Sequence, residues 1–243
     1  MTIAELAASA EIRAHAEAGR ITLSHPARQR GTMRGARFAD IRHALTTALS
    51  GEAQSNGCWR IDSADTDGDE LTVIVAIWHD VLVITVFQEI EPMKCPLCNK
   101  GAVKAADVEI SERVAGHTFT ATIHGEQCDA CNEVFYPGPA VEAFEIAVAR
   151  ALTSTDEAGG ETFKYARKAV GLRAEDLASL LGVARETISR WETGKHPIDS
   201  AALAVLALIV KDAAQGSTST LEVLRARREA KPLSKRVALK LAS

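Results

Sequence analysis

Hydrophobic positions change their spacing along the first part of the chain. Residues 3–18 and 38–50 show the three-to-four-residue spacing of amphipathic helices. The next stretches are short, alternating and rich in β-branched side chains, which is typical of strands: residues 57–62, 71–78 and 81–87. We therefore predict helices followed by a three-stranded antiparallel meander, a small α+β unit that ends near Pro92.

Both spacings return in the rest of the chain. Residues 105–125 alternate and predict a β-hairpin that turns at Ala115 and Gly116, and a helix is expected over 139–152. The stretch TSTDEAGG has the composition of a flexible linker, and short helical patterns follow it. We expect an α+β multidomain protein whose last folded part is all-α.

Charge divides the chain more clearly than composition does. Hydrophobic residues make up 47% and charged residues 25%, as in ordinary soluble proteins. Residues 1–160 carry 13 Lys and Arg against 23 Asp and Glu, whereas residues 161–243 carry 15 against 9. A polyanionic partner is therefore expected for the last third only. Without a membrane-length apolar run or a signal-peptide pattern, we expect a cytoplasmic protein that does not enter the membrane.

Four of the five cysteines form two CxxC pairs. In a reducing compartment this spacing favours a metal over disulfides, and four thiolates match the tetrahedral preference of zinc. A redox CxxC is the alternative, but the thioredoxin-like βαβ setting is missing. We predict one structural Zn²⁺, because no ligand position remains open for water, and we expect Cys58 to be a buried thiol. The predicted ligands are Cys95, Cys98, Cys128 and Cys131.

The stretch GLRAEDLASLLGVARETISRWETGKHPID predicts a helix-turn-helix. Its apolar residues have the spacing of two short crossed helices, and Gly182 permits a tight turn between them. The alternative is a plain helical hairpin with a solvated charged face. The second helix would project Arg185, Glu186, Ser189 and Arg190 towards base edges, while Arg173, Thr187 and Lys195 would contact phosphates.

This stretch resembles the Xre-type (Cro/cI) helix-turn-helix, in which the first, second and sixth residues of the recognition helix read bases. Those positions are Arg185, Glu186 and Arg190 here, and Glu186 departs from the amide of several relatives. Together with the MKCPLC start, hairpin and second CxxC, residues 93–213 resemble an MqsA-type antitoxin. The resemblance implies a structural zinc module that often contacts the toxin, and a C-terminal domain that dimerises and binds double-stranded operator DNA.

The first ninety residues carry a concentration of arginine. Residues 20–43 hold six arginines against Asp40 alone, and such a run is usually a solvated face or, less often, an RNA-binding patch. A histidine titrating near neutrality would complete an RNA-cleaving site, although His43 in a helical apolar pattern also fits a structural role. The candidate catalytic residues are His25, Arg28, Arg34 and His43.

This part of the chain also resembles a small RNase toxin of the RelE/MqsR-like fold. It departs from that fold in having no tyrosine, with Phe87 ending the last predicted strand. The resemblance implies a toxin-like partner fused before Met93. We expect an intramolecular contact in which the acidic middle part covers the arginines, with Glu109, Glu112 and Glu126 as the facing charges.

The acidic stretch DSADTDGDE superficially suggests a calcium loop. With Gly68 at the sixth position of such a loop, the twelfth position would be Ile74, which has no carboxylate to offer a metal. We therefore predict a hairpin turn.

These patterns divide the chain into five parts. They are residues 1–91, a toxin-type α+β domain; 92–152, a four-cysteine zinc-binding domain; 153–160, a linker; 161–213, an Xre-type helix-turn-helix domain; and 214–243, a basic tail. Two functions compete. The chain is expected to be a homodimeric, zinc-containing repressor with a toxin-like domain in cis, and not an enzyme when intact. The alternative is a latent RNA endonuclease in residues 1–91 that is held inactive by its own fused antitoxin.

Overall fold

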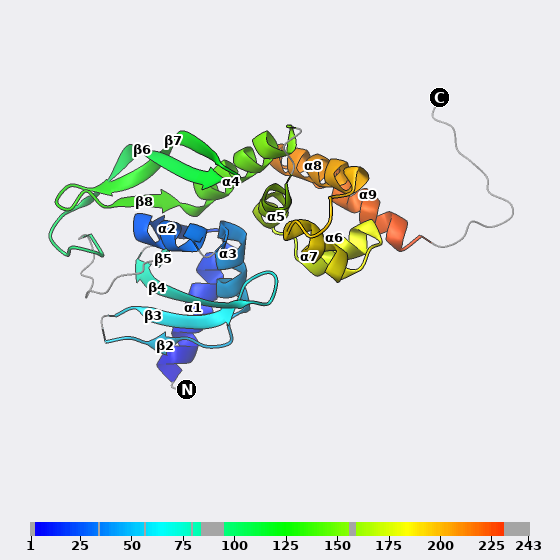
Figure 1. Ribbon diagram of the computed structural model, residues 1–243. Coiled ribbons are helices and arrows are strands. Elements are labelled where there is room, and N and C mark those ends of the chain that lie inside the picture. The colour runs from blue at the N-terminus through cyan, green and yellow to red at the C-terminus, as the bar shows by residue number, and fades with distance from the viewer. Residues whose placement is uncertain are drawn as a thin grey trace, which may run out of the picture.

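The computed structural model describes residues 3–33, 35–55, 57–78, 80–83, 95–155 and 159–230, and it has a mixed α+β fold (Figure 1). The helices are α1 (Ile3–Glu17), α2 (His25–Met33), α3 (Phe38–Thr47), α4 (Gly138–Thr153), α5 (Gly160–Ala169), α6 (Ala174–Leu181), α7 (Arg185–Glu192), α8 (Ser200–Ala214) and α9 (Ser219–Arg228). The strands are β1 (Ile21–Ser24), β2 (Glu52–Ala53), β3 (Trp59–Ala64), β4 (Glu70–Trp78), β5 (Asp80–Val83), β6 (Val103–Val114), β7 (His117–Cys128) and β8 (Val134–Pro137).

An N-terminal α/β region, a cysteine-containing region with a β-hairpin and a C-terminal helical region follow one another along the chain, as expected. Two details of the prediction need correction. The strand predicted from residue 57 begins at Trp59, and the helix predicted to residue 50 ends at Thr47. The last predicted strand is represented by β5, and its residues 84–87, like the boundary at Pro92, lie outside the described residues.

All described strands belong to a single sheet, with the order β2-β3-β4-β5-β1-β8-β7-β6. The predicted meander is therefore only part of it. The short strand β1 was not predicted, and it lies at the centre, parallel to β5 and antiparallel to β8. Leu23 of β1 faces Tyr136 of β8 in this register. The hairpin β6–β7 thereby extends the sheet of the N-terminal region instead of forming a sheet of its own.

Helix α2 was also not predicted, although its first turn carries local start signals. The hydroxyl of Ser24 accepts a hydrogen bond from the Ala27 amide at 3.3 Å, and Pro26 lies in the first turn, where a missing N–H costs nothing. The β6–β7 turn lies where the sequence places it. Ala115 and Gly116 both have positive φ, 49° and 81°, as the tight turns of two-residue hairpins require.

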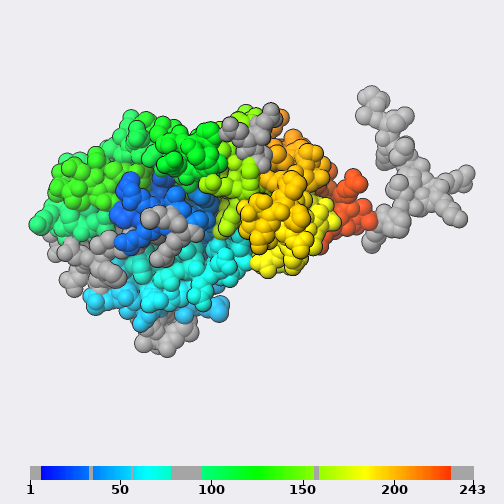
Figure 2. All heavy atoms as spheres, in the orientation of Figure 1, coloured from blue at the N-terminus to red at the C-terminus, as the bar shows by residue number. Residues whose placement is uncertain are grey.

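A continuous hydrophobic core joins the three regions. It contains Ile21 and Phe38 from the N-terminal region, Ile110 from β6, Phe144 from α4 and Phe163 from α5. In Figure 2 the N-terminal residues, in blue, lie between the β6–β7 hairpin in green and β3–β4 in cyan, with the C-terminal helices to one side. Within the described residues, no helix has both the length and the apolarity that a membrane span needs.

Gly138, the first residue of α4, marks the closest approach between two of these regions. A Cβ atom at this position would lie 2.2 Å from the Phe38 ring and 2.7 Å from the Ile21 carbonyl oxygen. Only glycine allows α4 to start directly against α3 and β1. The junction between the N-terminal region and the cysteine-containing region is therefore packed to backbone contact.

Candidate metal centre and nucleic-acid interface

The four paired cysteines lie on two turns with the same construction. In each turn, the amide of an asparagine with φ of 58° donates to the carbonyl of the first cysteine: Asn99 to Cys95 at 2.9 Å, and Asn132 to Cys128 at 3.0 Å. This conformation brings the third residue after each first cysteine, Cys98 and Cys131, back towards its partner. Cys95 and Cys128 are buried, whereas Cys131 is exposed.

The sulfur atoms of the two turns interleave. Sγ of Cys95 lies 3.7 Å from Sγ of Cys131, Sγ of Cys98 lies 3.7 Å from Sγ of Cys128, and all four sulfurs fall within 4.8 Å of one another. A disulfide needs about 2.05 Å. A tetrahedron with Zn–S bonds of about 2.3 Å has edges of about 3.8 Å. The four-cysteine cluster is therefore consistent with a metal site, and its size fits zinc.

The backbone around the cluster favours a thiolate at Cys98. The amides of Gly101 and Lys100 point at its sulfur and lower the pKa of the thiol to about 6. Burial raises the pKa of Cys95 and of Cys131 when no cation is present. A cation at the centre would remove the protons from all four sulfurs, since zinc binds thiolates. Cys58 lies immediately before β3, outside the cluster, and burial raises the pKa of its thiol.

Helices α6 and α7 form a compact pair at the surface of the C-terminal region. Gly182 lies between them in the left-handed conformation, with φ of 70°, so the chain reverses within a few residues. Leu177, Ile188 and Trp191 are buried on the inner side, and the Trp191 ring meets Phe163 edge-on at 5.7 Å. Two short helices that share a core in this way leave the first turns of α7 facing outwards.

The structure places nearly all the predicted DNA contacts on this outer side. The exposed ones are Arg173, Arg185, Glu186, Ser189, Arg190 and Lys195, and Thr187 is half-buried. Arg173 is also 3.6 Å from Glu175, its exposed neighbour in the first turn of α6. Exposed arginine and serine at the start of a helix are the groups that a major groove or a phosphate can meet.

A comparison with known families decides what these two sites belong to. Residues 93–214 match the family described as "Antitoxin component of bacterial toxin-antitoxin system, MqsA". The chain belongs to the MqsA antitoxin family. The match begins at Met93 and covers both the cysteine cluster and the α6–α7 pair, while residues 1–92 lie outside it. No curated protein matches the chain.

The candidate catalytic residues lie before the residues that match the MqsA family, and those that the structure describes do not form one site. Nδ1 of His25 is 3.0 Å from the Tyr136 hydroxyl, and burial, followed by the Arg28 charge, lowers the pKa of this imidazole. His43 lines a different hollow, with Glu17 and Gly171. Among the described residues, no hydrogen bond or ion pair joins His43 to His25 or Arg28. Arg34 lies outside the described residues.

Two of the N-terminal arginines are covered by the MqsA part of the chain. Arg28 is 7% exposed and Arg37 is 9% exposed. Arg28 donates to the Ser111 carbonyl at 2.7 Å and lies 3.5 Å from Glu112 of β6, and the Arg37 guanidinium pairs with the same carboxylate. Glu109, in contrast, is exposed, and its backbone carbonyl accepts from the Tyr136 hydroxyl.

Two further acidic residues of the MqsA part, which the sequence did not indicate, also contact the N-terminal region. Glu145 of α4 is buried and accepts from the Phe38 amide at 3.1 Å, and burial raises its pKa to about 8. Glu142, one turn away, pairs with Arg42 at 3.2 Å. The helical spacing of an apolar face predicts that residue 145 is buried, but it gives no indication that its partner lies 107 residues earlier in the chain.

Tyr165 of α5 joins the same contacts from the C-terminal region. Its hydroxyl donates to Glu112 at 3.2 Å, and the Arg37 guanidinium lies 4.1 Å from the centre of its ring. We call Arg28, Arg37, Glu112, Glu145 and Tyr165 the buried charge cluster. It draws one residue or more from each of the three regions.

Proposed function

We propose that this MqsA-family chain is a sequence-specific DNA-binding repressor of the toxin-antitoxin type. In this proposal the α6–α7 pair is a helix-turn-helix, α7 enters the major groove, and Arg185, Glu186 and Arg190 read bases with Ser189 beside them. Arg173, Thr187 and Lys195 fix the register on phosphates. The observation that carries the proposal is that these side chains, apart from the half-buried Thr187, are exposed on or beside a helical pair within the family match.

The operator-binding form is proposed to be a homodimer assembled through residues 161–213. A dimer of such modules reads two half-sites about one helical turn apart, so a pseudo-palindromic operator is expected. The net positive charge of residues 161–243, 15 Lys and Arg against 9 Asp and Glu, supports binding to a polyanion.

The cysteine cluster is proposed to hold one structural zinc. Cys95, Cys98, Cys128 and Cys131 would occupy the four coordination positions, which leaves none for water or a substrate. The bound ion supplies a cross-link between the two cysteine turns. The chain supplies the amides that favour thiolate at Cys98 and the buried positions of Cys95 and Cys128. The zinc-binding domain is proposed to comprise residues 92–152.

For residues 1–91 we propose a toxin-like domain that is silent in the intact chain. Arginines that would hold RNA phosphates are instead bound to Glu112, and His25 contacts Tyr136 and Glu133 of the zinc-binding domain. One observation also favours the alternative function, a latent RNA endonuclease in residues 1–91. The side chains covered by the antitoxin part include His25 and Arg28, two of the residues that an RNA endonuclease would need.

Binding of the intact chain to the DNA upstream of its own coding sequence tests the main proposal. A labelled duplex of that DNA should bind more tightly than a scrambled duplex of equal length and composition, and added salt should weaken both. The double variant Arg185→Ala/Arg190→Ala should lose the preference. Arg113→Ala, which removes another exposed arginine, from the β6–β7 hairpin, serves as the control. Equal affinity of the intact chain for the two duplexes would contradict the proposal.

Expression of residues 1–91 alone tests the alternative. Slowed growth with loss of RNA integrity is expected if the domain is a toxin, and Arg28→Ala should abolish both effects. Co-expression of residues 92–243 should restore growth. If the fragment is harmless and does not associate with residues 92–243, the toxin interpretation fails, whereas the DNA-binding proposal stands.

A further inference from the structure

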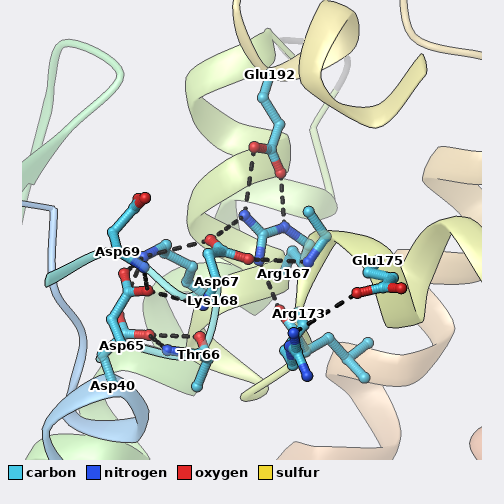
Figure 3. A network of polar contacts seen from close by, with 12 residues as sticks. Asp40, Asp65, Thr66, Asp67, Asp69, Arg167, Lys168, Arg173, Glu175 and Glu192 are labelled. Atoms are coloured by element: carbon cyan, nitrogen blue, oxygen red, sulfur yellow. Dashed lines mark hydrogen bonds and ion pairs between the residues drawn. The ribbon is translucent and has the colours of Figure 1, made fainter. Parts of the chain in front are cut away.

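The turn between β3 and β4 is an acidic loop held in one conformation by its own side chain. We call residues 65–69 the acidic turn. The Asp65 carboxylate accepts from the amides of Asp67 at 2.8 Å and Asp69 at 3.0 Å, and Gly68 has φ of 91°. This is the hairpin turn that the sequence predicts, and its conformation directs the Asp67 side chain away from the sheet. Figure 3 shows the turn facing α5 and the start of α6.

Asp67 binds the helical region that is proposed to recognise DNA. Arg167 of α5 donates one N–H to each carboxylate oxygen of Asp67, both at 3.0 Å, and the amide of Ala174 donates to the same carboxylate at 2.9 Å. Ala174 is the first residue of α6. These contacts keep the pKa of Asp67 below its usual value in spite of burial. The N-terminus of α6 is thus capped by a carboxylate from a distant part of the chain.

The same arginine also reaches the far end of α7. Arg167, which is fully buried, donates to Glu192 through Nε at 2.6 Å and through a terminal nitrogen at 3.3 Å. Beside it, Lys168 is 2.8 Å from Asp65, 3.3 Å from Asp40 and 3.5 Å from Asp67. The acidic turn is therefore attached to α5 by buried ion pairs, to the start of α6 by a hydrogen bond, and to α7 through Arg167.

The acidic turn also borders the surface that would face DNA. A hollow of about 370 Å³ is lined on one side by Asp67 and Asp69, and on the other by Arg185, Glu186 and Ser189 of α7. Lys164, Arg167, Ala174 and Glu192 complete the lining. Residues predicted to read bases and the carboxylates of the N-terminal region thus share one opening.

A DNA backbone on this surface would meet the acidic turn in two ways. Phosphates prefer helix N-termini and arginine or lysine side chains, and the Asp67 carboxylate already takes both the Ala174 amide and Arg167. In addition, phosphates that approach α7 come near the negative charges of Asp67 and Asp69, and like charges repel. The Asp67 carboxylate therefore occupies a position that would favour a phosphate, and its negative charge repels phosphates nearby.

We propose that the acidic turn competes with operator DNA for the α6–α7 pair, so that tight DNA binding requires the turn to leave. This inference rests on the proposed DNA-binding function and adds its regulation: the N-terminal region holds the repressor in a state of low DNA affinity. Because coupling between two binding events is reciprocal, operator DNA also weakens the attachment of the N-terminal region to the helices.

Affinity of full-length variants for a duplex of the upstream DNA tests the competition. Asp67→Ala removes the carboxylate that binds Arg167 and Ala174, and about tenfold tighter binding is expected, within the range usual for coupled sites. Asp69→Asn should give a smaller gain. Within the described part of the chain no side-chain contact of Asp69 is found, so this variant keeps the fold and decides the test if Asp67→Ala folds poorly.

Asp62→Asn is the matched control. It removes the same charge from β3, where the Asp62 carboxylate contacts Arg60 and Thr72 and does not line the hollow, so it should bind like the parent chain. Equal or weaker binding by both Asp67→Ala and Asp69→Asn would overturn the competition.

Arg190→Ala distinguishes a failure of the competition from a failure of the proposed DNA-binding function. If Arg190→Ala weakens the parent chain and Asp67→Ala equally while those two have the same affinity, DNA binding stands and only the competition fails. If no chain binds the duplex, the proposed function itself fails.

Hydrogen exchange gives an independent readout. The amides of Asp67 and Asp69 should exchange faster when the duplex is bound, because the Asp65 carboxylate that accepts from both loses its anchor on Lys168 once the turn has left the helices. Unchanged protection in the DNA complex would overturn the proposal.

Discussion

Two pairs of arginines in this chain have opposite surroundings. Arg28 and Arg37 are buried against Glu112, whereas Arg185 and Arg190 of α7 are exposed. Both pairs occur in short polar stretches next to a helical pattern, so their local sequences look alike. What separates them is a glutamate about 75 residues away in β6, which only the folded sheet brings near. Arginine content therefore identifies a polyanion-binding surface only when the partner carboxylates are known.

Loss of a metal ligand should change the difference between the covered and the exposed arginines the most. Cys128→Ala should lose zinc and unfold the cysteine-containing region, since metal binding to such sites contributes on the order of 10 kcal/mol. The covered arginines would then become accessible, while α5 to α8 stay helical. Zinc content by mass spectrometry and proteolysis at the N-terminal arginines measure the two effects. Cys58→Ala, a buried cysteine outside the cluster, should keep the metal. Folded, metal-free Cys128→Ala protein would contradict the structural role.

Removal of the shared carboxylate should have the next largest effect. Glu112→Ala leaves Arg28 and Arg37 buried without a counter-charge, so the free energy of unfolding should fall by about 3–5 kcal/mol. Denaturant titration measures the change. Glu109→Ala is the control on the same strand, where an exposed side chain should change stability by less than about 0.5 kcal/mol. Similar losses in both variants would remove the distinction between covered and open arginines.

The exposed arginines should affect DNA binding and leave folding unchanged. Arg190→Ala should weaken operator binding by about 1–3 kcal/mol and relax one base position, since a bidentate contact to guanine would be lost. Lys195→Ala should weaken all sequences alike and flatten the dependence on salt. Affinities for the operator and for single-base variants, measured at several salt concentrations, test this. A uniform loss in both variants would show that the base-reading and phosphate-binding roles are wrongly assigned.

A pH dependence is also predicted within the buried charge cluster. The pKa of Glu145 is about 8 in the folded chain, raised by burial and by Glu112 and partly offset by Arg37, against about 4.3 in an unfolded chain. Between these two pH values, the Glu145 carboxyl holds a proton in the folded chain but not in the unfolded chain. The free energy of unfolding should therefore fall as pH rises through this window, by at most about 1.4 kcal/mol per pH unit.

Comparison with Glu145→Gln isolates this contribution. The variant cannot ionise, so its stability should depend less on pH between 5 and 8 than that of the parent. Glu142→Gln, on the partly exposed side of the same helix, should keep the parental slope. Equal slopes for the parent and Glu145→Gln would exclude this carboxyl as the source.

Local sequence was sufficient where contacts are short in range. The two CxxC turns, the hairpin at Ala115 and the α6–α7 pair each depend on neighbours within a few residues, and each lies where the sequence places it. The sequence failed for β1, whose four residues acquire their place only from β5 and β8, about 60 and 115 positions later. Ser24 and Pro26 could have indicated the start of α2.

The sites show the same division. The four cysteines could be read as one cluster because spacing and ligand chemistry determine it. The distribution of His25 and His43 over different surfaces could not be read, because it depends on the packing of α3 against α1 and β3 and of β8 against β1. The acidic turn was predicted as a turn, but nothing in its sequence indicates that Asp67 would meet Arg167, 100 residues further on.

The pairing of β1 with β8 has a consequence for dosage. Two separate proteins held together by such an edge would dissociate when diluted below their dissociation constant, and their balance would follow the relative rates of their synthesis and degradation. Here both strands belong to one polypeptide, so the cover over Arg28 and Arg37 forms in a unimolecular step. The fraction of chains in which Arg28 and Arg37 are covered is therefore the same in a cell that holds a single copy as in a concentrated solution. The ratio of the N-terminal region to the antitoxin part is fixed at one, because both are translated as one chain.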